Sequence, residues 1–353
     1  MSGDEQDKIK IVDPTSVHTQ NFPKILEQLG ISIAVTTYQA GKIILLRNEN
    51  GTLNTHFSSF IRPMGMCANQ QHLYLGDRYR IIKFSNMPAL SGRLDPPDKV
   101  DNCYIPRNIH ITGDIDIHEM ETDKEDKLWF INTKFSTLCT LDGESSFVPV
   151  WRPEFISALA DEDRCHLNGL CMIDGKPKYM TALGATDSRG GWRENKRDGG
   201  ILMDVDTNKI VLDKLSMPHS PRWYREKLWL LESGEGHLST VDLKKKKLTM
   251  IAELPGFTRG IDFIGSLAFI GLSQIRETAT FSKLPITERL KERICGVWVV
   301  NIENGQTVAY MKFTAGVEEI FSVKILQQTR WPDILEVDND LQLTSYTVPD
   351  QYI

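Results

Sequence analysis

Three histidines recur at corresponding positions in a repeat of short apolar strands, and this repeat most constrains the fold. They occur in Asp116-Ile117-His118, His166-Leu167-Asn168 and Pro218-His219-Ser220, with spacings of 48 and 53 residues. Each histidine lies at or just before an apolar run that begins a new group of strands. Repeats of about 40 to 50 residues with several strands each are typical of β-propeller blades. Because the first strand of every blade lines the central channel, we expect the three imidazoles to converge.

The strand groups predict an all-β fold, a six-bladed β-propeller. The groups begin near residues 31, 65, 116, 166, 222 and 260. A single sheet of this kind has two apolar faces, so the sheets are expected to stack around an axis. The late apolar run 320–326 is expected to join the strands from residue 31 on, which would close the ring and remove exposed sheet edges. A seventh blade is the alternative, but the residues after 326 are few and polar.

The repeat also sets the predicted domain boundaries. Residues 1–30 form an N-terminal extension with a short helix at 22–29, which has Pro23 near its start and Gly30 just past its end. Residues 31–330 form the propeller and residues 331–353 a C-terminal tail. Three long insertions, at 88–103, 184–200 and 272–294, are expected as loops, and loops of this length often cover a functional site.

The composition of the chain bears on which partners it can bind and on the cellular compartment in which we expect it. The 353 residues carry a net charge of −6, and a chain with that balance is a poor candidate for binding nucleic acid. No apolar stretch approaches the roughly 20 residues that span a bilayer, and the acidic N-terminus lacks an apolar signal region. Six cysteines without a CxxC pair favour reduced, buried thiols. We therefore expect a cytoplasmic protein without a membrane or nucleic-acid partner.

The residues at the blade starts are the candidates for chemistry. His118, His166, His219 and Glu319 would suit a divalent metal ion such as Zn, Mn or Fe, since imidazole and carboxylate are common ligands. Asn168 could orient an imidazole. A second interpretation needs no metal: the histidines act as acids or bases while Arg259 binds an anion. A third is structural, with each histidine satisfying backbone groups at the start of its blade.

Further polar residues are candidates for substrate binding. Arg222 and Arg62 also stand near blade starts, and a guanidinium suits a carboxylate or phosphate, although pairing between blades is an equal alternative. Tyr38 and Gln39 lie at a turn that could face the channel mouth or be a simple hairpin. Trp192 lies in the glycine-rich insertion 184–200, which suits a lid over a polar ligand, and an inert excursion is the alternative.

Five longer strings resemble those of an uncharacterised bacterial protein family that is sometimes fused to tetratricopeptide repeats. The strings are His166-Leu167-Asn168-Gly169, Thr181-Ala182-Leu183-Gly184, Pro218-His219-Ser220-Pro221-Arg222, Leu254-Pro255-Gly256-Phe257-Thr258-Arg259-Gly260 and Gly271-Leu272-Ser273-Gln274. The resemblance extends from about residue 30 to 330. It implies a β-propeller and supplies no activity and no catalytic residue.

The favoured function is an enzyme that acts on a small polar or anionic molecule at the channel mouth. Its chemistry would be of lyase, isomerase/cyclase or hydrolase type, with or without a metal. The alternatives are a small-molecule sensor that uses the same pocket and a non-catalytic scaffold for a protein partner. A scaffold needs an exposed apolar patch, for which Trp223, Tyr224 and Trp331 are the candidates.

Overall fold

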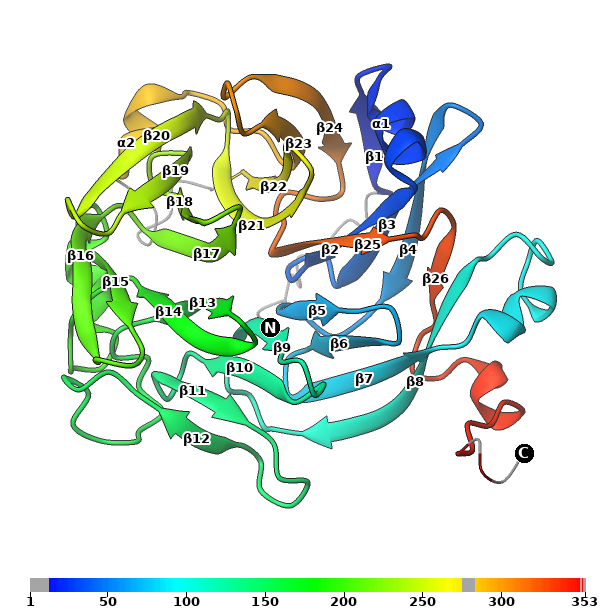
Figure 1. Cartoon of the computed structure of the whole chain (residues 1–353), viewed down its shortest axis with the longest axis horizontal. Helices are drawn as coiled ribbons and strands as arrows, with labels where there is room; N and C mark the ends of the chain where they lie inside the picture. Colours follow the sequence, from blue (N-terminus) through cyan, green and yellow to red (C-terminus); the bar gives the residue numbers. More distant parts are fainter. Residues whose placement is uncertain (1–12, 275–282, 350, 352–353) are drawn as a thin grey trace, which may run out of the picture.

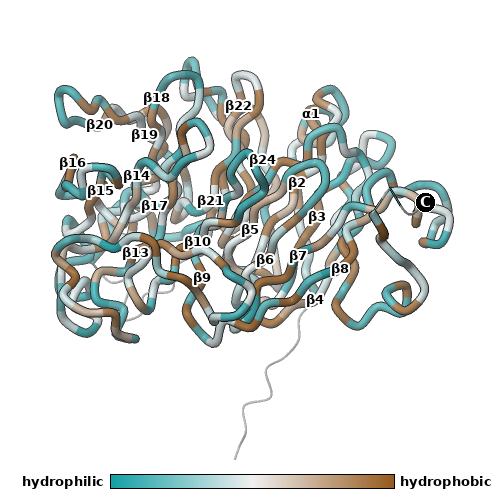
Figure 2. The backbone as a smooth tube through the Cα atoms, turned by 60° about the horizontal axis from the view of Figure 1, so that its bottom comes forward, coloured by the Kyte–Doolittle hydropathy of each residue, from teal (hydrophilic) through white to brown (hydrophobic). Residues whose placement is uncertain are grey.

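Six sheets surround a central channel in the computed structural model, which describes residues 13–274, 283–349 and 351. Each sheet contains four or five strands, and successive strands are antiparallel neighbours from the channel outward (Figure 1). The predicted six-bladed β-propeller is confirmed. Figure 2 shows hydrophobic residues along the strands and hydrophilic residues at many of the connecting loops.

The blades have the following strands, named from the channel outward. Blade 1 contains β25 (Ser322–Gln327), β2 (Ile31–Thr37), β3 (Lys42–Glu49) and β4 (Thr52–Ser59). Blade 2 contains β5 (Met66–Ala68), β6 (His72–Gly76), β7 (Arg80–Asn86) and β8 (Asn102–Ile111). Blade 3 contains β9 (Ile117–Thr122), β10 (Leu128–Asn132), β11 (Thr137–Thr140) and β12 (Val148–Trp151).

The second half of the ring repeats this order. Blade 4 contains β13 (Leu167–Ile173), β14 (Lys176–Ala182), β15 (Gly200–Asp204) and β16 (Lys209–Leu215). Blade 5 contains β17 (Pro218–Tyr224), β18 (Lys227–Glu232), β19 (His237–Asp242) and β20 (Lys247–Glu253). Blade 6 contains β21 (Phe257–Ile264), β22 (Leu267–Ser273), β23 (Gly296–Asn301) and β24 (Thr307–Ala315).

The ring closes through the C-terminal strand, as the sequence predicted. β25 pairs antiparallel with β2 over six residue pairs, from Ile31 opposite Gln327 to Thr36 opposite Ser322. Because β25 is the innermost strand of blade 1, closure also places the last strand of the ring against the channel. Residues of β25 therefore lie beside the central channel.

Two further strands extend the blades on either side of the closure, and the sequence carried no clear signal for them. β1 (Thr15–His18) pairs with β24 at the outer edge of blade 6, and β26 (Pro332–Ile334) pairs in parallel with β8 at the outer edge of blade 2 (Figure 1). Strands of four and three residues are too short to show a period. β1 and β26 thus extend the two blades that flank blade 1.

The helices are short and lie outside the sheets. α1 (Phe22–Leu29) has proline in its first turn and ends at Gly30, whose φ of 63° is left-handed, as the sequence pattern predicted. The other helical segments are α2 (Pro285–Arg289) and the 3-10 helices η1 (Pro88–Arg93), η2 (Gly191–Asn195) and η3 (Asp340–Leu343). None of the helices in the described part of the chain is long and apolar enough to cross a bilayer. The predicted insertions 88–103 and 184–200 hold η1 and η2, and residues 275–282 of the third lie outside the described residues.

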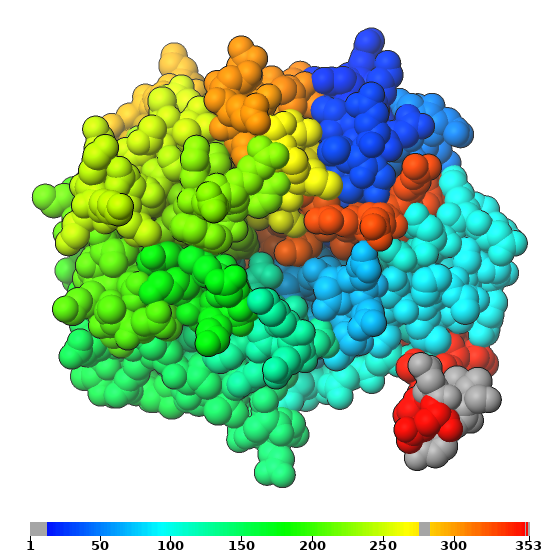
Figure 3. Space-filling view, viewed as in Figure 1, coloured from blue at the N-terminus to red at the C-terminus, as the bar shows by residue number. Residues whose placement is uncertain are grey.

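The core is formed where the faces of neighbouring blades pack together. Trp229 and Leu231 of blade 5 pack against Ile270 and Trp298 of blade 6, and all four side chains are buried. All six cysteines are buried and unpaired. Figure 3 shows the hollow that remains at the centre of the ring, next to the orange-red C-terminal segment. Packing between blades therefore fixes the inner strands around an open axis.

Candidate functional site

The inner strands surround a cavity of about 300 Å³, here called the histidine cavity. Its wall includes His118, His166 and His219 together with Arg259, so residues more than a hundred positions apart meet in one place. The complete lining is Tyr38, Arg62, Met64, Asp116, His118, His166, Leu183, Trp192, Arg193, Met217, His219, Phe257, Arg259 and Phe321. Every blade contributes at least one of these residues.

The His118 imidazole is held in one tautomer by its neighbours. Its Nδ1 lies 3.1 Å from the backbone oxygen of Asp116 and 2.7 Å from the hydroxyl of Thr133. Thr133 donates its own hydroxyl hydrogen to the backbone oxygen of Leu167, at 2.6 Å, so it accepts from the imidazole. Nδ1 therefore carries the hydrogen. Nε2 is left as an acceptor, and it is buried without a hydrogen-bond partner among the described residues.

His219 repeats this arrangement two blades further on. Its Nδ1 lies 2.9 Å from the backbone oxygen of Met217 and 2.9 Å from the hydroxyl of Ser233, which donates to the backbone oxygen of Thr258. In both blades the hydroxyl thus fixes the imidazole and also ties the blade to the next one. Burial, followed by the positive charge of Arg259, lowers the pKa of His219 well below its ordinary value. Burial also lowers the pKa of His118, so both rings are neutral near pH 7.

His166 has a different partner, a carboxylate. Its Nδ1 lies 3.0 and 3.1 Å from the two oxygens of Asp163. The same carboxylate accepts hydrogen bonds from Trp192 Nε1 at 2.8 Å and from Arg193 at 3.2 Å. The Trp192 ring lies against the His166 ring, with 4.4 Å between centroids. The 184–200 insertion is thereby anchored over His166, and the rings of His166 and His118 meet edge to face at 4.9 Å.

Arg259 presents hydrogen-bond donors that no described residue uses. Its guanidinium lies 3.6 Å over the ring of Phe321, and its nearest carboxylate oxygen, on Glu319, is 3.9 Å away. Arg62 also lines the cavity, and it lies 3.8 and 3.9 Å from the carboxylates of Asp114 and Asp116. All these separations exceed hydrogen-bonding distance. The cavity therefore contains two guanidinium groups that are attracted to carboxylates without being bonded to them.

Glu319 does not line the cavity, although one of its carboxylate oxygens lies 3.9 Å from Arg259. Its residue is 8% exposed, and neither carboxylate oxygen has a hydrogen-bond partner in the described part of the chain. Burial raises its pKa to about 7, although Arg259 acts in the opposite direction. A carboxyl group in this position is partly protonated at neutral pH.

Besides Glu319, three predicted site residues do not line the cavity. Arg222 forms a two-pronged ion pair with Glu119, at 2.8 and 3.1 Å, so its donors are already used inside the channel. Asn168 is buried and accepts a hydrogen bond from Thr181. Gln39 is on the exterior, where its amide approaches the hydroxyl of Tyr38 at 3.4 Å. Arg222 comes three residues after His219 on β17, which carries its side chain along the channel and away from the mouth.

The structure adds site residues that the sequence analysis did not name. Asp163 and Arg193 contact each other beside His166, and Thr133 and Ser233 orient His118 and His219. One signal was available: the two hydroxyl residues follow their histidines by 15 and 14 positions. Asp163, three residues before His166, shows no repeat of its own. Its role depends on the 184–200 insertion, which folds back so that Trp192 and Arg193 reach its carboxylate.

The donor set as arranged does not fit a metal ion. Within residues 13–274, 283–349 and 351, no three histidine, cysteine, aspartate or glutamate side chains are grouped so that they could hold one. Glu319 is absent from the lining of the cavity that the three histidines share, and its carboxylate lies 3.9 Å from Arg259. A metal centre formed by His118, His166, His219 and Glu319 stays a prediction.

Comparison with known proteins identifies a family and a fold. The model of a family described as Domain of unknown function (DUF4915) matches residues 20–335. A chain in the crystal structure of a Nidogen/Laminin complex is similar with a TM-score of 0.55 and 11% identity, over 84% of this chain and 99% of that one. A protein of unknown function from Bacteroides caccae is similar with a TM-score of 0.52 and 7% identity, over 84% and 98%. No curated protein shows a significant match.

Proposed function

Because this chain belongs to the DUF4915 family, whose description assigns no activity, we propose a function from the site itself. The histidine cavity binds a small organic anion that also carries hydroxyl groups, and it transforms this anion by acid–base chemistry of lyase or isomerase type. The cavity size, its two guanidinium groups and the neutral imidazoles of His118 and His219 support this proposal. Similarity at 7% to 11% identity supports the fold alone and adds nothing about the substrate.

The Arg259 guanidinium carries the proposal. It lies in the cavity wall, and its nearest carboxylate oxygen among the described residues, on Glu319, is 3.9 Å away. Leaving donors of a buried charged group without partners costs about 1 to 3 kcal/mol or more. A ligand carboxylate or phosphate would supply paired acceptors to the planar fork and recover that free energy. Arg62, which is 38% exposed, would approach the same anion from the mouth of the cavity.

The imidazoles then have two different roles. The Asp163 carboxylate stabilises Nδ1–H on His166 and the imidazolium that forms when Nε2 takes a proton, which is the arrangement of a general base. His118 and His219 present Nε2 as neutral acceptors and would orient the hydroxyl groups of the ligand. Trp192 and Arg193 cover His166, and this insertion would exclude water from the reacting atoms.

A sensor that binds the same anion without turnover is the second candidate. It uses the same Arg259 and His118, so only the absence of product separates it from an enzyme. A protein scaffold is less well supported, because Trp331 is buried and Tyr224 is partly buried and stacks on Phe263, which leaves Trp223 as the exposed one of the three candidates. The cytoplasmic location, the bacterial source and the tetratricopeptide fusion of the resembled family stay predictions.

Binding of sulfate and glycolate to the purified full chain tests the proposal. We expect titration calorimetry to detect binding to the wild type and at least tenfold weaker binding to Arg259→Gln. Arg225→Gln is the matched control, since Arg225 is half exposed and pairs with Glu303 on the outside of the ring. Equal affinity in the wild type and Arg259→Gln would overturn the proposal. A panel of hydroxycarboxylates is then incubated with the protein, and NMR follows the formation of product. Product that forms with the wild type and not with His166→Gln indicates an enzyme, whereas binding without product indicates a sensor.

A further inference from the structure

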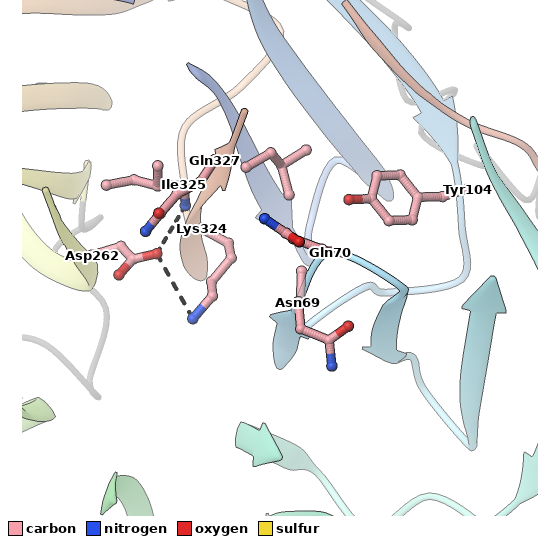
Figure 4. Close-up of a pocket in the computed structure, with 9 residues that line it drawn as sticks. Asn69, Gln70, Tyr104, Asp262, Lys324, Ile325 and Gln327 are labelled. Atoms are coloured by element: carbon pink, nitrogen blue, oxygen red, sulfur yellow. Dashed lines mark hydrogen bonds and ion pairs between the residues drawn. The ribbon is translucent and has the colours of Figure 1, made fainter. Parts of the chain in front are cut away.

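We propose that a second cavity, at the other end of the channel, binds a neutral polyhydroxylated molecule of about the size of one sugar ring. This lysine cavity has a volume of about 270 Å³ and shares no lining residue with the histidine cavity. It is lined by Ala68, Asn69, Gln70, Tyr104, Asp262, Lys324, Ile325, Leu326 and Gln327, most of which are labelled in Figure 4. The proposal is independent of the function proposed for the histidine cavity.

Strand β25 shows how the two cavities are separated. Phe321, just before the strand, lines the histidine cavity, whereas Gln327 at its end lines the lysine cavity. The nearest lining residue of the lysine cavity along this strand is Lys324, and the three residues of extended chain from Phe321 to Lys324 span about 10 Å. Between the two ends, the Arg222–Glu119 ion pair fills part of the channel. A ligand in one cavity therefore does not occupy the other.

The charges beside the lysine cavity select against anions. Lys324 Nζ lies 3.7 Å from Glu121 Oε1 and 3.7 Å from Asp262 Oδ2. Although burial opposes it, the carboxylates of Asp262 and Glu121 hold the pKa of Lys324 above its ordinary value, so the amine stays charged. Three carboxylates, those of Glu119, Glu121 and Asp262, face two cations, Lys324 and Arg222. The local excess is one negative charge, which disfavours phosphate or a carboxylic acid.

Several polar groups of this cavity still lack hydrogen-bond partners among the described residues. The Lys324 ammonium is 3.7 Å from its two carboxylates, which is too far for hydrogen bonds. The Tyr104 hydroxyl points into the space between the labelled side chains in Figure 4, and burial raises its pKa to about 12, so it stays protonated. The Gln327 amide is exposed at the edge of the site. Together these groups offer both donors and acceptors.

A ligand hydroxyl matches this mixture because it donates and accepts at once. One hydroxyl could donate to Asp262 while it accepts from Lys324, and a neighbouring hydroxyl could pair with Tyr104. The Tyr104 ring, Ala68 and Ile325 supply an apolar part of the wall for C–H groups. The volume lies below the roughly 300–1,000 Å³ of sites for drug-sized ligands, which favours a single ring. These features point to a monosaccharide or cyclic polyol.

Saturation-transfer NMR on the full chain tests the inference. The probes are neutral aldohexoses, aldopentoses and inositols, with sulfate and glycolate as anionic comparisons. We expect at least one neutral probe to bind with a Kd of about 1 mM. Its affinity should fall about five- to tenfold in Tyr104→Phe and in Gln327→Leu, because each removes one hydrogen bond. Arg259→Gln should leave it unchanged, since that residue belongs to the other cavity.

Tyr179→Phe is the matched control, because Tyr179 is also buried but lines neither cavity. Absence of saturation transfer to every neutral probe would overturn the inference. Equal affinity in the wild type, Tyr104→Phe and Gln327→Leu would overturn it too, since the probe would then bind elsewhere. Binding of the anions that is lost in Tyr104→Phe would show that the site has the opposite charge preference.

Discussion

Arg259 and Glu319 face each other with 3.9 Å between Nη1 and Oε1, and no hydrogen bond joins them. Glu319 is buried and Arg259 is partly buried, and both carboxylate oxygens of Glu319 lack partners in the described residues. The carboxylate is thus a distant counter-ion of a guanidinium whose donors face the cavity. An anion that binds Arg259 adds a second negative charge near Glu319. Anion binding and protonation of Glu319 should therefore be coupled.

The affinity for an anion should depend on pH because of this coupling. Repulsion from a bound anion favours the protonated form of Glu319, whose pKa is already raised to about 7 by burial. We expect glycolate to bind most tightly below pH 7 and to lose affinity, by at most about tenfold per pH unit, as the pH rises above it. Glycolate does not titrate in this range. Calorimetry at several pH values checks the slope, and Glu319→Gln should abolish it; a slope that survives in this variant contradicts the coupling.

The stability of the fold should respond to the same group. Glu319 releases its proton at about pH 7 when folded and near its ordinary value of 4.5 when unfolded. Between these values the folded state holds more protons, so its contribution to stability falls as the pH rises and is constant above 7. Glu319→Gln should thus stabilise the protein by roughly 1 to 3 kcal/mol at pH 8 and have little effect at pH 5. Urea unfolding at both pH values measures the difference, and an equal effect at both would refute it.

Asp163 should hold the 184–200 insertion in place. It accepts hydrogen bonds from Trp192 and Arg193, and the neutral amide of Asp163→Asn would weaken both. We expect about tenfold faster tryptic cleavage within the insertion, because the open state becomes more populated. Asp161→Asn, two residues away and exposed, is the control. Unchanged cleavage in Asp163→Asn would show that other contacts keep the insertion closed.

The hydroxyl groups behind the histidines should stabilise the ring of blades. Thr133→Val keeps the side-chain shape but removes the bridge between His118 and the backbone oxygen of Leu167. The free energy of unfolding should fall by about 1 to 3 kcal/mol, and Ser233→Ala should cost a similar amount in blade 5. Thr240→Val is the matched control on a strand outside the bridges. Denaturant midpoints decide the comparison, and equal losses in all three variants would contradict a special role for the bridges.

Chelation should leave anion binding unchanged. The described histidine, cysteine, aspartate and glutamate side chains form no three-ligand group, so the arginine-based site needs no metal ion. We expect elemental analysis of the purified protein to find zinc, manganese and iron below stoichiometric amounts. Glycolate affinity should be the same before and after EDTA. Loss of binding on chelation, restored by one of these metals and abolished in His166→Ala, would instead support the predicted metal centre.

The repeat in the sequence was sufficient to predict the architecture. Strand groups begin every 34 to 56 residues, so six blades and their closure by 320–326 followed from counting. His118, His166, His219 and Arg259 occupy corresponding positions near the starts of their blades, which explains why they line one cavity. Corresponding positions in a ring converge whatever the side chains are. The strands β1 and β26 were not predicted, because short segments gain their structure from the edges that they pair with.

The partners of each polar group could not be predicted from local sequence. Arg222 and Arg259 both stand at blade starts, yet Glu119, 103 positions away, occupies one guanidinium while the other remains open to the cavity. A bulge between His219 and Arg222 on β17 adds a shift in register that no sequence pattern reveals. The neutral state of His118 likewise follows from burial among distant blades.

The order of strands and the convergence of the blade starts were thus determined by the sequence alone, because periodicity and chain connectivity are local properties. Tertiary structure decided which side chains in the channel are satisfied and which are left available, as with Glu319 near Arg259 and Lys324 between Glu121 and Asp262. The reason is physical: desolvation and charge pairing depend on neighbours brought together only when the ring closes.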